Sequence, residues 1–134
     1  MLTLTLAQRE AVVATCIRAL PNEGCGLLIG STDGVVHEVV ASENVADSAR
    51  IYEIDPKVLL LATRRADDDG LEVIGVFHSH THSDPYPSPT DVAQAPDPSW
   101  HYVLISLARS PAQVLSYRIA GGDVAAEVLD VTSD

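Results

Sequence analysis

A short apolar run at residues 71–77 ends directly in the sequence His78-Ser79-His80. The run follows Gly70 and contains valine, isoleucine and phenylalanine, which favours a buried strand. On a strand, side chains two residues apart point to the same side, about 6 to 7 Å from each other at their Cα atoms. On a helix they would point about 200° apart. We therefore predict a strand whose end carries two imidazoles that can converge on one ion.

A third ligand follows in the sequence, after a loop at residues 81–87 that contains two prolines. Ser88 and Pro89 are typical of a helix start, with serine as the N-cap and proline at the first helical position. Asp91 then lies in the first turn of this helix, from which it can reach the two histidines. Two imidazoles and one carboxylate leave one position of a tetrahedral zinc ion open, as in catalytic zinc sites. The sequence therefore predicts a Zn²⁺ site.

Hydrolysis at such a site also needs a carboxylate outside the metal shell, which takes a proton from water and returns it to the leaving amine. Glu23 is the candidate, because it lies between a helix end and a glycine-rich strand entry without a clear structural task. The alternative is a plain surface acid. Ser88 offers a hydroxyl to a developing oxyanion, a role that is compatible with capping the helix. His82 is either a surplus ligand or a residue at the rim of the cleft.

The rest of the chain alternates helical and strand patterns. Thr5 and Gln8 fit a capping box, and an apolar stripe behind them is typical of a helix: Leu6, Val13, Ile17 and Leu20. Two further helices are expected at 56–67 and 89–95, and strands at 25–29, 35–41, 71–77, 102–107, 112–119 and 124–131. This order predicts an α/β fold, with one domain over residues 1–134 and a mixed central sheet flanked by helices.

The charge of the chain limits its partners. A net charge of −11, from 19 acids against 8 lysines and arginines, argues against binding nucleic acid or anionic lipid. No segment approaches the run of about 20 apolar residues that a membrane span needs, and the N-terminus lacks the features of a signal peptide. Cys16 and Cys25 form no C-x-x-C motif, so we expect two reduced, buried thiols. These features predict a cytoplasmic protein.

The motif formed by Glu23, His78-Ser79-His80, Ser88 and Asp91 resembles the JAMM motif of the MPN+ zinc metalloproteases, without any deviation in spacing. The resemblance extends over about residues 21–107 and implies a cytidine-deaminase-like fold. It implies zinc bound by His78, His80 and Asp91, with Glu23 as the acid/base and Ser88 as the oxyanion stabiliser. Ser79 and His82 are added as candidates for substrate binding.

Within this family, the stretches 21–26 and 86–91 are most similar to the Mec-type peptidases of actinobacteria. The resemblance implies hydrolysis after the C-terminal Gly-Gly tail of a ubiquitin-like sulfur-carrier protein, with release of cysteine in cysteine biosynthesis. The alternatives are a JAMM peptidase of another substrate class, such as a desampylase-like or cell-wall-peptide hydrolase, and a non-catalytic MPN scaffold. A zinc deaminase is excluded, because its P-C-x-x-C ligands are absent. Whether the chain forms a homodimer stays open.

Overall fold

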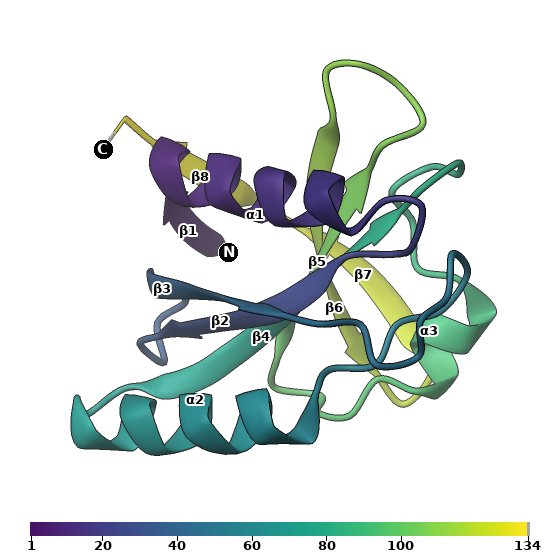
Figure 1. The fold of residues 1–134 in the computed structure, drawn as a ribbon. Helices are drawn as coiled ribbons and strands as arrows, with labels where there is room; N and C mark the ends of the chain where they lie inside the picture. Colours follow the sequence, from purple (N-terminus) through teal and green to yellow (C-terminus); the bar gives the residue numbers. More distant parts are fainter. Residues whose placement is uncertain (134) are drawn as a thin grey trace.

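The computed structural model describes residues 1–133, and its centre is a mixed sheet of six strands (Figure 1). These strands are β2 (Cys25–Gly30), β3 (Val36–Ser42), β4 (Glu72–His80), β5 (His101–Ser106), β6 (Gln113–Ala120) and β7 (Asp123–Glu127). Their order across the sheet is β3-β2-β4-β5-β6-β7. Only β4 and β5 run parallel within this sheet, and the other described pairs are antiparallel.

Two helices cover the opposite faces of the sheet, α1 (Leu6–Ala19) on one side and α2 (Pro56–Asp68) on the other (Figure 1). A short helix, α3 (Pro89–Ala93), lies in the connection between the parallel strands β4 and β5. The predicted α/β class, a mixed sheet flanked by helices, is therefore confirmed.

The strand period of two residues divides the core between these faces. On β5, Val103 and Ile105 pack in the cluster that includes α1, whereas Tyr102 and Leu104 pack in the cluster that includes α2. Phe77 of β4 is fully buried on the α1 side. The central strands are thus apolar on both faces, which explains why they read as continuous apolar runs in the sequence.

A small second sheet differs from the prediction. It pairs β1 (Leu2–Thr5) with β8 (Leu129–Thr132) in parallel. The predicted single strand at 124–131 is wrong, because the chain leaves the large sheet at Val128, whose carbonyl accepts a hydrogen bond from the Leu2 amide at 3.0 Å. Strands of four residues are too short for a period to be read reliably from sequence.

The buried face of α1 also differs from the predicted apolar stripe. Leu6, Ile17 and Leu20 are 46%, 52% and 47% exposed, whereas Val12 and Cys16 are fully buried. A Cβ atom at Gly24 would come within 2.6 Å of the Cys16 Cα, so the helix packs very closely against the start of β2. The side chains that meet Gly24 are the small ones of Cys16 and Ala19. The predicted capping box of Thr5 and Gln8 is confirmed.

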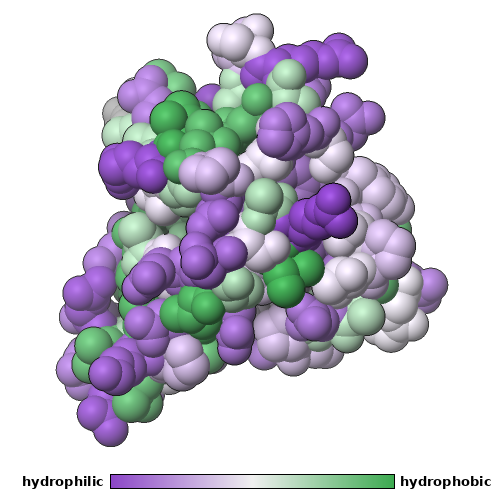
Figure 2. Space-filling view, turned by 45° about the vertical axis from the view of Figure 1, so that its right-hand side comes forward, coloured by the Kyte–Doolittle hydropathy of each residue, from purple (hydrophilic) through white to green (hydrophobic). Residues whose placement is uncertain are grey.

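The exposed apolar side chains are spread over the surface. In the space-filling view, hydrophobic residues form separate groups among hydrophilic ones on the face that is shown (Figure 2). Exposed leucines of α2, Leu60 and Leu61, add to those of α1. Across residues 1–133, the structure contains no helix with the length and hydropathy of a membrane span.

Candidate active site

The strand β4 carries the two histidines to the edge of the core. The predicted strand ended at residue 77, but pairing continues to His80, which lies opposite Ser106 of β5. The Ser79 amide also donates to the Gly24 carbonyl at 3.0 Å. Because side chains alternate along a strand, His78 and His80 point to one side and Ser79 to the other.

The helix α3 brings the carboxylate of Asp91 to these histidines. Ser88 is its N-cap: the hydroxyl accepts a hydrogen bond from the Asp91 amide at 3.0 Å, and the Ser88 amide donates to Asp91 Oδ2 at 2.9 Å. This reciprocal capping box fixes both the helix start and the direction of the carboxylate. A structural signature of helix initiation therefore also orients a metal ligand.

The three donors fit a zinc ion. Asp91 Oδ2 lies 3.1 Å from His78 Nε2 and 3.0 Å from His80 Nε2, and all three side chains are buried. Ligand atoms about 2.0 to 2.1 Å from a tetrahedral zinc ion are about 3.3 Å apart, close to these separations. His78 Nε2 is buried and has no well-aligned hydrogen-bond partner among the described residues. A bound cation would satisfy this orphaned lone pair, so the predicted zinc site exists as an assembled donor set.

The protonation states of two donors, Asp91 and His78, also suit a metal. Burial opposes ionisation of Asp91, but the imidazoles beside it hold its pKa well below the usual range. Burial lowers the pKa of His78, which favours the neutral, metal-binding form. His80 Nδ1 lies 2.9 Å from the Asp84 carbonyl. Donation from Nδ1 to that carbonyl leaves Nε2 as the ligand atom, which is the usual arrangement around a metal-bound histidine.

Glu23 lies just before β2, in a cleft that His80 also lines. Its side chain is only 3% exposed, and Oε1 has no hydrogen-bond partner among the described residues. Burial, together with the negative charge of Asp91, raises the pKa of this carboxyl to about 7, and the imidazole of His80 opposes part of this shift. A buried carboxyl with a free oxygen and a pKa near neutrality has the properties of a general acid/base rather than those of a surface acid.

Of the other predicted site residues, Ser88 and His82 line the cleft and Ser79 does not. Ser88 lines a cavity of about 420 Å³ together with Glu23, His80 and the exposed His82. The structure does not bring Ser79 to this cleft. Ser79 is fully buried, and its hydroxyl accepts a hydrogen bond from the Gly24 amide at 2.8 Å. The strand alternation that aligns the histidines turns Ser79 towards the backbone next to Glu23, so its position serves structure and not substrate.

The thiols match the prediction of two reduced, buried cysteines. Cys16 and Cys25 are free and fully buried. Burial raises the pKa of each thiol to about 12, so neither forms a nucleophilic thiolate near neutral pH.

Two further residues support the site and were not predicted. The Tyr52 ring stacks on the His78 imidazole, with centroids 4.1 Å apart and an interplanar angle of 18°. The Asn44 side-chain amide donates to the Glu23 carbonyl at 3.0 Å and to the Ile51 carbonyl at 3.0 Å. Neither residue belongs to a sequence motif, because both act through the path of the loop between β3 and α2.

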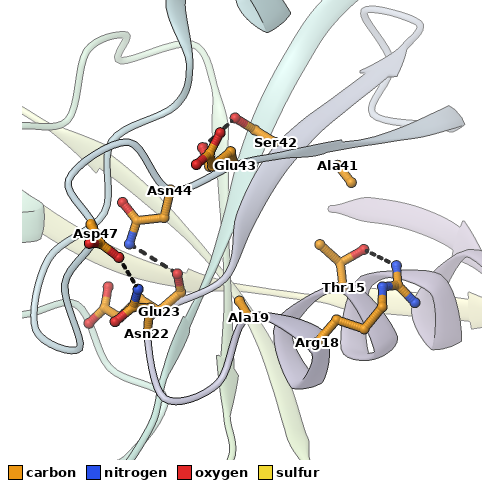
Figure 3. A pocket seen from close by; sticks show the side chains of 10 residues that line it. All are labelled: Thr15, Arg18, Ala19, Asn22, Glu23, Ala41, Ser42, Glu43, Asn44 and Asp47. Atoms are coloured by element: carbon orange, nitrogen blue, oxygen red, sulfur yellow. Dashed lines mark hydrogen bonds between the residues drawn. The ribbon is translucent and has the colours of Figure 1, made fainter.

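Asn44 lies beside a second cavity, of about 380 Å³, which Glu23 also lines (Figure 3). Figure 3 shows the Asn44 amide reaching the Glu23 backbone, and Asn22 reaching Asp47 on the neighbouring turn. Asp47 has a φ of 50°, a left-handed conformation that the 2.6 Å hydrogen bond from Asn22 Nδ2 helps to hold. The segment that carries Glu23 is thus tied to the loop on one side and to β4 on the other.

Similarity to known proteins identifies the family. Residues 6–120 match the prokaryotic homologues of the JAB domain. The CysO-cysteine peptidase of Mycobacterium tuberculosis is 36% identical over 125 residues, which cover 91% of this chain and 85% of that protein. The desampylase of Haloferax volcanii is 36% identical over 88 residues, or 64% of this chain and 63% of that protein.

Among solved structures, a protein of Desulfitobacterium hafniense has a TM-score of 0.92 and 36% identity, over 100% of this chain and 94% of that one. The match of residues 6–120 to the prokaryotic homologues of the JAB domain confirms the resemblance inferred from the sequence motif. The chain belongs to the prokaryotic homologues of the JAB domain, and with its buried donor set it is a hydrolase of the JAMM metallopeptidase type.

Proposed function

We propose that this peptidase hydrolyses the bond after the C-terminal glycine of a ubiquitin-like sulfur-carrier protein and releases cysteine, as a step of cysteine biosynthesis in the cytoplasm. The observation that carries the proposal is that Glu23 and Ser88 line one cleft together with His80, which forms the donor set with His78 and Asp91. The CysO-cysteine peptidase, similar over 91% of this chain, supports the choice of substrate. We further propose that residues 1–134 act as one catalytic domain.

In this proposal His78, His80 and Asp91 hold zinc, which when bound acidifies a water molecule and polarises the scissile carbonyl. Glu23 takes the proton from the attacking water at its unpartnered Oε1 and passes it to the leaving amine. The glycine carbonyl carbon gains the water oxygen, and its bond to the amine nitrogen breaks. A pKa near 7 lets one carboxyl perform both proton transfers.

Ser88 contributes through its hydroxyl. The oxygen accepts a hydrogen bond from the Asp91 amide, which leaves the hydroxyl proton free to point into the cleft. A donor at this place can stabilise the negative charge that develops on the carbonyl oxygen.

The substrate assignment is tested by mass spectrometry. Purified zinc-loaded protein is incubated with a sulfur-carrier protein that bears a C-terminal cysteine after its Gly-Gly tail. We expect the carrier to lose the mass of one cysteine residue, and the Glu23→Gln variant to leave the adduct intact. An adduct that survives with active, zinc-loaded wild-type protein would show that the substrate is wrong.

A second candidate is the removal of a ubiquitin-like protein from a lysine side chain. The similarity to the desampylase of Haloferax volcanii favours this alternative, although it covers only 64% of the chain. An isopeptide-linked conjugate in the same assay separates the two functions, because only a deconjugating enzyme cleaves it.

A further inference from the structure

Arg50 lies at the mouth of the cleft that contains the proposed catalytic groups. It lines the 420 Å³ cavity together with Glu23, His80 and Ser88, and it is the one lysine or arginine among the residues that line it. A cavity of this size is in the range of small-ligand sites. The cleft therefore has one fixed positive charge close to its catalytic carboxyl.

The backbone that carries Arg50 is tied to the backbone of Glu23. The Arg50 amide donates to Ser48 Oγ at 3.0 Å, and the Glu23 amide donates to the Ser48 carbonyl at 2.9 Å. Asn44 joins the Glu23 and Ile51 carbonyls on either side of this turn (Figure 3 shows its contact with Glu23). The position of Arg50 relative to the catalytic acid is thus fixed by hydrogen bonds and not by its own side chain.

The guanidinium of Arg50 is exposed and, within residues 1–133, has no hydrogen-bonded or ionic partner. Several other arginines have partners, such as Arg65 with Glu38 and Arg118 with the Ser99 carbonyl at 3.0 Å. Arg64 and Arg109 have none among the described residues either, but neither lines this cavity, so its place at the cleft distinguishes Arg50. In a chain with 19 acids and 8 lysines and arginines, an arginine without a carboxylate partner beside a cleft is available for an anionic ligand. A guanidinium binds a carboxylate through two parallel hydrogen bonds.

We propose that Arg50 binds the α-carboxylate of the amino acid that is released, and so selects a substrate with a free C-terminal residue after the glycine. This inference rests on the proposed peptidase function. In such a substrate a single carbon separates the carboxylate from the scissile nitrogen, so the anion must lie at the mouth of the same cleft. At an isopeptide bond, the lysine side chain intervenes and the corresponding carboxyl group is part of a peptide bond without charge. Arg50 therefore favours trimming of one residue over deconjugation.

The test compares two substrates of equal shape: the carrier with a C-terminal cysteine, and the same carrier with cysteinamide, which has no negative charge. We expect wild-type protein to cleave the acid with a kcat/KM about 10- to 100-fold higher than the amide, with most of the difference in KM. Arg50→Ala should lower cleavage of the acid to the level of the amide and leave cleavage of the amide unchanged. Arg50→Lys, which keeps the charge without the planar fork, should restore part of the difference.

Arg64→Ala is the matched control, because it removes the same charge from an exposed position on α2. It should leave both substrates unaffected, whereas an equal loss in Arg64→Ala would assign the effect to net charge. If Arg50→Ala slows both substrates equally, or slows neither, the carboxylate site is refuted while the peptidase function stands. If wild-type protein cleaves neither substrate, the proposed function fails, and the carboxylate site fails with it.

Discussion

At the scale of single residues, Glu23 combines burial, a free oxygen and a pKa of about 7. The Glu23→Gln substitution keeps the shape of the side chain and leaves the three metal donors unchanged. We expect the variant to bind zinc as the wild type does and to lose about 10²- to 10⁴-fold in turnover. Metal content is checked by elemental analysis and turnover by cysteine release. A variant with full zinc and a near-normal rate would exclude Glu23 as the general base.

The same carboxyl predicts the pH dependence of the reaction. Only the ionised form can accept a proton from water, so kcat/KM should fall as the pH drops below the pKa of Glu23, which burial raises to about 7. A bound cation nearby lowers this value, so the acid limb is expected at or below about pH 7. A pH profile of cysteine release measures this limb, and a rate that rises as the pH falls through this range would contradict the assignment.

The sequence predicted the metal donors because their spacing has a direct physical meaning on a strand and at a helix start. The position of Glu23 before a strand made it a candidate, but only the resemblance favoured it over a plain surface acid. Nothing in the order of residues shows that this acid lines the same cavity as His80. Tyr52 and Asn44 escaped prediction for the same reason. Their contacts with His78 and Glu23 depend on the path of an irregular loop.

At the scale of elements, α1 gives a matched pair of substitutions. Val12→Ala removes two carbon atoms from a fully buried side chain, and should cost about 2 kcal/mol of the free energy of unfolding. Ile17→Ala, at a side chain that is 52% exposed, should cost no more than about 0.5 kcal/mol. Urea denaturation measures both. Equal losses would show that the helix buries the face formed by the predicted stripe.

Elements with strong local signals, such as the capping box of Thr5 and Gln8, the N-cap Ser88 and the buried strands β2, β4 and β5, were predictable from sequence. The pairing of β1 with β8 was not, because it joins two four-residue strands from opposite ends of the described chain. The buried face of α1 was predicted wrongly. Its orientation follows from the close contact with Gly24, which is a tertiary constraint and leaves no trace in the helical period.

At the scale of the whole molecule, Glu127 connects strands of the large sheet away from the cleft. Its Oε2 lies 2.7 Å from both His101 Nδ1 and Ser116 Oγ. Burial alone would raise its pKa, but these hydrogen bonds lower the pKa from 4.5 to about 2. A carboxylate whose pKa is lower in the folded than in the unfolded chain stabilises the fold at pH values above its unfolded-state pKa. This contribution is lost as the pH falls towards the folded-state pKa.

We therefore expect Glu127→Gln to lower the free energy of unfolding by about 1.5 to 3 kcal/mol at pH 7. The difference from wild type should shrink as the pH falls from 4.5 towards 2. Glu72→Gln, at an exposed position of β4, is the control and should change stability by no more than about 0.5 kcal/mol. A difference that does not depend on pH would rule out an ionised Glu127 as the source of the stabilisation.

Zinc binding should also stabilise the whole domain, because its ligands come from β4 and α3 and are correctly spaced only in the folded state. Zinc at about 1,000 times its Kd adds about 4 kcal/mol, so a chelator should lower Tm by on the order of 10 °C. His80→Ala should lose this response in a thermal melt. Identical melting of wild-type protein with and without chelator would argue against a metal in this cleft.

The most direct test of the central claim is a titration of metal-free protein with zinc, while cysteine release from the carrier adduct is measured. A single group of donors, His78, His80 and Asp91, predicts that the rate rises from near zero and reaches its plateau at one zinc ion per chain. Full activity in the chelated protein, or a rate that does not change as zinc is added, would contradict a zinc peptidase at this site.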